Sequence, residues 1–136
     1  MTIPDPIKRP GKAGKAALWG LQILLSAAFL MAGFAKLSGQ PAMVADFQTI
    51  GLGQWFRYLT GAIETTGAIL LLFPRLASAG AALLACTMAG AVLAHLTKLP
   101  GSPVPPLVLG ILSAIILWGR IGLLKAWLTQ PDREGA

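Results

Sequence analysis

Residues 57–73 read RYLTGAIETTGAILLLF, and this stretch decides the fold. It is a hydrophobic run of membrane-spanning length with one carboxylate, Glu64, near its middle. An ionisable side chain inside the hydrocarbon is costly unless it is paired, neutralised or hydrated. Glu64 therefore predicts either a packed polar interior or a functional site in the membrane.

Working outward, the whole chain has the composition of a membrane protein. Of its 136 residues, 55% are hydrophobic and only 12% are charged. A helix needs about 20 apolar residues to cross the hydrocarbon, and four windows qualify: residues 16–36, 55–73, 76–96 and 105–124. We predict an all-α integral membrane protein, an antiparallel four-transmembrane-helix bundle over residues 16–125. Its first span is read as a retained signal anchor. A disordered basic tail (residues 1–15) and a polar tail (residues 126–136) flank the predicted bundle.

The net charge of +6 does not indicate a nucleic-acid partner, because the basic residues lie at the ends of apolar segments. One side of the predicted bundle carries eight of them: Lys8, Arg9, Lys12, Lys15, Arg75, Arg120, Lys125 and Arg133. The other side carries three: Lys36, Arg57 and Lys98. This asymmetry predicts that both termini are cytoplasmic, with Arg120 as an anchor at the inner interface.

Small residues predict where helices pack closely. Gly33 and Gly61 lie on the polar faces of the first and second spans, and the third span has a four-residue repeat of Ala77, Ala81, Ala85 and Ala89. The loop between the first two spans is predicted to hold a short helix over part of residues 39–53. That helix would lie flat in the interface or cover the mouth of the bundle.

Antiparallel threading brings Lys36, Arg57 and His95 toward the outer mouth, with Glu64 below them. Two interpretations stay open. In the first, Glu64 pairs with Lys36 or Arg57 and fixes the register of the bundle. In the second, the cluster binds a small polar headgroup or relays protons for a redox partner. His95 is read as an interfacial side chain bonded to a loop carbonyl, or as a proton-carrying or ligand-contacting group.

Several kinds of active site lack the residues they need. The single cysteine, Cys86, completes no CxxC pair, and the single histidine, His95, has no second histidine for a bis-histidine haem. No nucleophile motif, glycine-rich phosphate loop or zinc or iron–sulfur spacing is present. We therefore expect no catalytic residues, no metal site and no cofactor held by this chain alone.

Three short patterns resemble the DoxX family: AGFAKL at residues 32–37, GAIETTGA at 61–68 with its LLLFPR turn, and MAGA at 88–91. The similarity extends over roughly residues 18–124, and Lys36 and Glu64 match its most telling positions. The resemblance implies a small bacterial inner-membrane protein with four helices. The family is named after a subunit of a thiosulfate:quinone oxidoreductase, and some members are linked to oxidative-stress membrane complexes. Activity varies across the family, so the resemblance does not imply an enzyme.

Two hypotheses follow. The leading one is an accessory subunit or scaffold of a redox or quinone-linked membrane complex, with Lys36 and Glu64 as its polar core and with a larger membrane or peripheral protein as partner. Whether a quinone is bound stays open. The alternative is a small homo-oligomeric transporter, or a lipid- or quinone-binding membrane protein without catalysis of its own. That alternative predicts a cavity between the first three helices, open to the outer side.

Overall fold

The computed structural model describes residues 11–129, and every element in that part of the chain is an α-helix. The helices are α1 (Lys12–Ser38), α2 (Pro41–Ile50), α3 (Gln54–Leu70), α4 (Ala77–Thr97) and α5 (Val104–Thr129). The predicted all-α class is confirmed for these residues. The predicted tails fall mainly on residues 1–10 and 130–136, which lie outside the described residues. Within the described residues, α1 begins four residues before the predicted span and α5 continues past it, to Thr129.

Three of the described helices are long and apolar enough to cross a membrane: α1, α4 and the part of α5 from Val104 to Ala126. Helix α3 coincides with the remaining predicted window but has only 17 residues. It ends at Leu70, three residues before the predicted boundary. The cause is Pro74, which has no N–H to donate to the Leu70 carbonyl. That carbonyl instead accepts from Phe73 at 3.1 Å, and the chain leaves the helix through tight turns.

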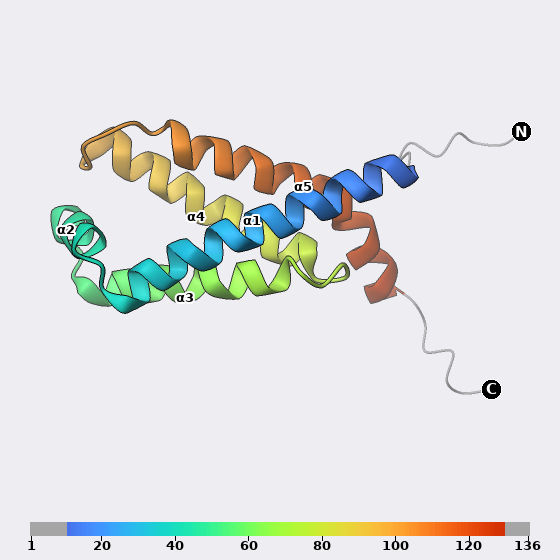
Figure 1. The fold of residues 1–136 in the computed structure, drawn as a ribbon, viewed down its shortest axis with the longest axis horizontal. Coiled ribbons are helices and arrows are strands. Elements are labelled where there is room, and N and C mark those ends of the chain that lie inside the picture. The colour runs from blue at the N-terminus through green and yellow to red at the C-terminus, as the bar shows by residue number, and fades with distance from the viewer. Residues whose placement is uncertain (1–10, 130–136) are drawn as a thin grey trace, which may run out of the picture.

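The four long helices run back and forth along the molecule, with α1 crossing over the others (Figure 1). Helix α1 packs mainly on α3 and α4 mainly on α5, while α3 also packs on α4 and joins the two pairs. The start of α1 and the end of α5 lie at the same end of the molecule (Figure 1). The buried apolar core lies between these helices and comprises Leu25, Phe29, Ala68, Leu71, Ala77, Ala81, Leu84, Met88 and Ile116.

The turn from α3 to α4 is held closed by two glycines, Gly67 and Gly80. A Cβ placed on Gly80 would lie 2.7 Å from the carbonyl oxygen of Gly67, and one placed on Gly67 would lie 2.8 Å from a carbon of Leu84. Neither distance leaves room for a methyl group. The two helix backbones are therefore in direct contact just above the turn, which holds α3 and α4 as a tight hairpin.

Helix α2 lies at the opposite end of the molecule, beside the end of α1 and the start of α3 (Figure 1). The predicted short helix in this loop is confirmed. Its buried residue Phe47 contacts Phe56 of α3, with ring centroids 5.8 Å apart. The Gln54 side chain donates to the Val44 carbonyl at 3.1 Å. These contacts fix α2 across the start of α3.

The outer surface of the four long helices is strongly apolar. Trp118 is 83% exposed, Met31 74% and Phe34 69%. In the most apolar 18-residue window of each spanning helix, few residues are buried inside the chain: 33% in α1, 33% in α4 and 17% in α5. Side chains of this kind on all sides of a helix are typical of proteins surrounded by lipid.

Candidate functional site

The candidate site lies where α1 crosses α3, and two glycines determine how closely these helices approach. A Cβ placed on Gly33 would lie 3.1 Å from the carbonyl oxygen of Gly61 and would collide with the hydroxyl of Thr65. A Cβ placed on Gly61 would lie 3.0 Å from the Cβ of Lys36. Because neither helix carries a side chain at the contact, the Lys36 side chain starts next to the backbone of α3.

Lys36 and Glu64 form a direct ion pair across this contact. Nζ of Lys36 donates to Oε2 of Glu64 at 3.0 Å. The Glu64 side chain is only 2% exposed, whereas that of Lys36 is 14% exposed. It is the only ion pair within residues 11–129. The carboxylate is thus enclosed by the protein, and the ammonium group is its one charged partner in the described residues.

Arg57 lies next to the ion pair and binds the backbone of Lys36 instead of the carboxylate of Glu64. Its guanidinium is buried and donates through Nη1 to the carbonyl of Lys36 and through Nε to Oε1 of Gln54, the latter at 2.8 Å. It also lies 4.3 Å from the centroid of the Tyr58 ring. A cation at the last turn of a helix stabilises unpaired carbonyls and the negative end of the helix dipole. Arg57 therefore fixes the end of α1, while Glu64 pairs with Lys36 rather than with Arg57.

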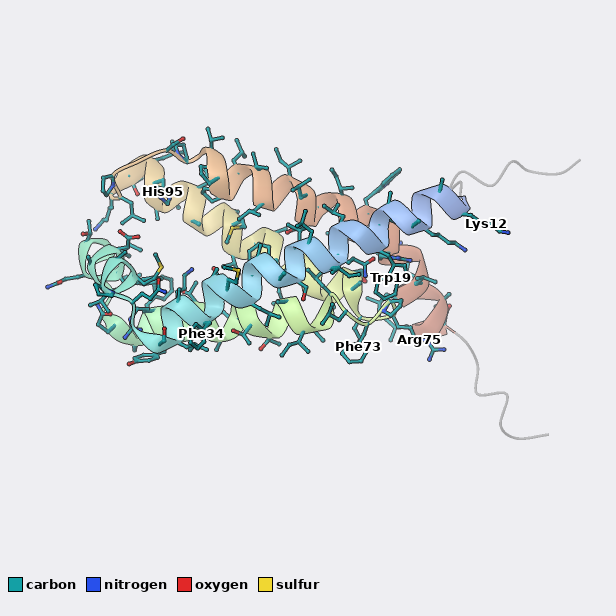
Figure 2. All side chains as sticks on the ribbon, viewed as in Figure 1. Lys12, Trp19, Phe34, Phe73, Arg75 and His95 are labelled. Carbon is teal, nitrogen blue, oxygen red and sulfur yellow. The ribbon has the colours of Figure 1, made fainter. Side chains whose placement is uncertain are left out.

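His95 lies on a different helix from the ion pair, at the end of the molecule where α2 lies (Figure 1 and Figure 2). It lies near the end of α4, and its Nδ1 donates to the carbonyl of Ala91 at 2.9 Å, one turn earlier in the same helix. Figure 2 shows His95 at the end of the molecule opposite Trp19, Phe73 and Arg75. No hydrogen bond connects His95 to Lys36, Arg57 or Glu64 in the described part of the chain. The structure thus brings three of the four predicted polar residues together.

Comparison with known proteins places the sequence in a family. The model of the DoxX-like family matches residues 20–124. The chain belongs to the DoxX-like family. This confirms the resemblance seen in the sequence and makes the chain a membrane protein of that family. No curated protein and no solved structure matched the sequence.

The small residues of this DoxX-like protein do not all pack alike. Ala77 and Ala81 are fully buried, Ala85 is half-buried and Ala89 is exposed. The alanine repeat of α4 therefore lies in the helix contact only over its first half. Gly80, which was not singled out in the sequence, lies against the backbone of Gly67 in α3.

Sequence reasoning also missed a buried polar network at the opposite end of the DoxX-like bundle. Gln22 of α1 is fully buried; its Nε2 donates to the carbonyl of Leu71 at 2.8 Å, and its Oε1 accepts from Nε of Arg120 at 2.7 Å. The predicted role of Arg120 as an interface anchor is wrong, because this side chain is 5% exposed and lies between helices. The sequence feature that could have indicated this network is Gln22 itself, because a polar side chain inside an apolar window usually forms hydrogen bonds to another helix.

The arrangement at Lys36 and Glu64, an ammonium group in contact with an enclosed carboxylate, can hold a proton or a charge. Within residues 11–129 no cluster of histidine, cysteine or carboxylate side chains is suited to a metal ion. Cys86 is exposed on α4, whereas the ion pair joins α1 and α3. The site of this DoxX-like protein is thus a closed pair in the α1–α3 contact, supported by Arg57.

Proposed function

We propose that this DoxX-like protein is an accessory subunit of a redox or quinone-linked complex in the bacterial inner membrane. The Lys36–Glu64 pair is the observation that supports the proposal best. An ion pair buried in a membrane helix contact is an expensive way to hold two helices together, and ionisable residues there usually have a function. In this proposal the pair keeps a charge or a proton at the α1–α3 contact, next to a surface that a partner covers.

The proposal includes four membrane-spanning helices. Helix α3 is roughly 26 Å long at about 1.5 Å per residue, slightly short of the hydrocarbon thickness of about 30 Å. The apolar turn residues Leu71, Leu72 and Phe73 extend it at one end, and Trp55 and Tyr58 begin it at the other. Its position between α1 and α4 supports the same conclusion, because a helix packed on two membrane spans is itself surrounded by apolar groups.

Both termini are proposed to be cytoplasmic. The start of α1 and the end of α5 lie together, and Arg75 lies at the same end (Figure 2). The positive-inside rule assigns the end richer in lysine and arginine to the cytoplasm. At the opposite end, two of the three basic side chains, Lys36 and Arg57, are occupied by bonds within the protein. That leaves Lys98 as the exposed cation of the outer end.

The alternative of an open transporter is less well supported by the geometry. A transport site between the first three helices needs polar groups that a substrate can reach. Here the ammonium group of Lys36 is hydrogen-bonded to Glu64. The guanidinium of Arg57 is hydrogen-bonded to the Lys36 carbonyl and to Gln54. The large apolar surface of the single chain favours a protein that is covered by a partner or by lipid.

Replacing Glu64 by glutamine in the native host tests the proposal. Glu64→Gln keeps the shape and the hydrogen-bond acceptor but removes the negative charge. We expect lower assembly of the complex and lower quinone-linked activity in isolated membranes. Asp46→Asn is the matched control, because Asp46 is the one other carboxylate in residues 11–129 and lies on α2. Unchanged assembly and activity in Glu64→Gln membranes would refute a functional role for this carboxylate.

A further inference from the structure

The four long helices form two pairs, α1 with α3 and α4 with α5, and the buried contacts between the pairs lie in one half of the bundle. The buried residues of α4 all lie between Ala77 and Met88, and none of residues 89–97 is buried. The two pairs diverge toward the end of the molecule where α2 lies (Figure 1). We call this the α2 end, and the half of the bundle that contains Arg120 the Arg120 half.

In the Arg120 half, buried contacts hold the two pairs together. Nε of Arg120 on α5 donates to Oε1 of Gln22 on α1 at 2.7 Å, and both side chains are buried. Between the same two helices, a Cβ placed on Gly119 would lie 2.8 Å from a carbon of Leu18. The glycine contact next to the α3–α4 turn joins the other two helices. Each helix of the first pair is therefore fixed to a helix of the second pair in this half.

At the α2 end, one exposed hydrogen bond connects the pairs. Helix α2 belongs to the α1–α3 pair, because its contacts with Gln54 and Phe56 fix it to α3. Nζ of Lys98, the residue after α4, donates to the carbonyl of Ile50, the last residue of α2, at 3.4 Å. Among the side-chain hydrogen bonds within residues 11–129, only this bond and the bond of Arg120 join the two pairs.

The two regions therefore differ in how strongly they hold the pairs. In lipid, helices are held together by close packing and by interhelical hydrogen bonds, because lipid tails are as apolar as the helix surfaces. The Arg120 half has both kinds of contact, and both are buried. At the α2 end, the bond of Lys98 is long and exposed, so water and salt weaken it. Regions with few buried contacts open at a low cost in free energy.

We propose that α2 is a strap across the α2 end of the bundle and that Lys98 is its releasable contact. In the closed state, Lys98 is bound to Ile50, as in this structure. In the open state, Lys98 is released and the α4–α5 pair swings away from the α1–α3 pair about the contacts of the Arg120 half.

The ion pair of Lys36 and Glu64 is kept in both states, because both residues belong to the α1–α3 pair. The strap therefore changes which apolar helix faces are accessible in the membrane without breaking that pair. The inference does not depend on the proposed redox role.

Distances between spin labels in the full-length protein, reconstituted into lipid nanodiscs, test the proposal. The labels are placed at exposed positions in a Cys86→Ala background. One label pair, Ser38→Cys with Ser102→Cys, joins the end of α1 to the α4–α5 connection and spans the α2 end. The other, Ala16→Cys with Gly122→Cys, joins α1 to α5 in the Arg120 half. Pulsed electron paramagnetic resonance gives the distribution of each distance.

Lys98→Met removes the charge and the donor that bind the end of α2. It should raise the ratio of long to short distances at the α2 end about two- to fivefold, the effect of losing a cation at a helix C-terminus. The distance between positions 16 and 122 should not change. Lys125→Met is the matched control, because Lys125 is also exposed but lies in the last turns of α5, away from the α2 end (Figure 1).

The proposal is overturned if Lys98→Met leaves the distances at the α2 end unchanged. It is also overturned if Lys125→Met alters these distances as much as Lys98→Met does. A shift of the distance between positions 16 and 122 by the same amount as the distance at the α2 end would mean that the pairs do not pivot about the Arg120 half, and would overturn it too.

Discussion

Gly33 of α1 lies directly against the backbone of Gly61 in α3, and this contact is what allows Lys36 to reach Glu64. Each charged residue comes three positions after its glycine. The Cα–Cβ bonds of a helix tilt toward its N-terminus, and α1 and α3 run in opposite directions (Figure 1). Lys36 therefore points back along α1 while Glu64 points back along α3. Their side chains meet across the glycine contact.

The first prediction concerns this contact. Gly33→Ala should destabilise the protein by about 1–3 kcal/mol, the usual cost of overpacking, because the new methyl group meets Thr65 and the Gly61 carbonyl. Gly20→Ala is the control, since nothing lies within 4 Å of a Cβ at that position of the same helix. Thermal unfolding in detergent measures both. Equal stability of the two variants would show that the helices are not in contact at Gly33.

The ion pair predicts coupling between positions 36 and 64. Lys36→Met removes the one charged partner of a buried carboxylate, and Glu64→Gln removes the charge that Lys36 pairs with. Both single variants should be less stable than the native protein, and the double variant should lose less than the sum. For residues in contact, the loss of the double variant differs from the sum of the two single losses by about 0.5–3 kcal/mol. Unfolding free energies of the four proteins give the value, and strictly additive losses would contradict the direct pair.

Arg57 should not be replaceable by lysine. The planar guanidinium serves Lys36 and Gln54 at once, which a single ammonium group does not reproduce. We expect Arg57→Lys to cost about 1–3 kcal/mol, the range for a hydrogen bond to a charged group. The same exchange at Arg75, which is exposed and makes no hydrogen bond within the described residues, should be neutral. A neutral Arg57→Lys exchange would show that the Lys36 carbonyl does not need this donor.

Much of the fold follows from the sequence because hydrophobic length is a strong signal in a membrane protein. The apolar windows located α1, α4 and α5, and the glycines at positions 33 and 61 together with Lys36 and Glu64 indicated the α1–α3 contact. The sequence predicts that this span ends at Phe73, three residues after the observed end of α3 at Leu70. The apolar run continues through Phe73, whereas the helix ends where the missing N–H of Pro74 breaks its hydrogen-bond ladder.

The polar network of Gln22 and Arg120 could not be predicted in the same way. Arg120 follows Trp118 near the end of an apolar window, and charge counting assigns such a residue to the interface. Its burial depends on Gln22, which is 98 residues away in the sequence. For a related reason, the sequence indicated the end of the bundle at which His95 lies but not its hydrogen bond to Ala91. Threading brings chain ends to one side of the membrane, but it does not say which side chains on that side meet.

The proposed topology predicts which side of the membrane each loop faces. In a Cys86→Ala background, Thr49→Cys and Ser102→Cys should react with a membrane-impermeant maleimide added to intact spheroplasts. Thr129→Cys should react only after permeabilisation. Thr49 and Ser102 on the same side of the membrane require an even number of crossings between them. Because α4 crosses, α3 must then cross as well. Labelling of Thr49→Cys and Thr129→Cys but not of Ser102→Cys in intact spheroplasts would mean that α3 does not cross.

Purification from the native membrane in a mild detergent, followed by mass spectrometry of all bound proteins and small molecules, tests the proposed function most directly. We expect a redox protein in stoichiometric amount, with or without a quinone, and less of it when the purified chain carries Glu64→Gln. Asp46→Asn should retain the partner. Recovery of a homo-oligomer free of any redox protein or quinone would contradict the accessory-subunit proposal.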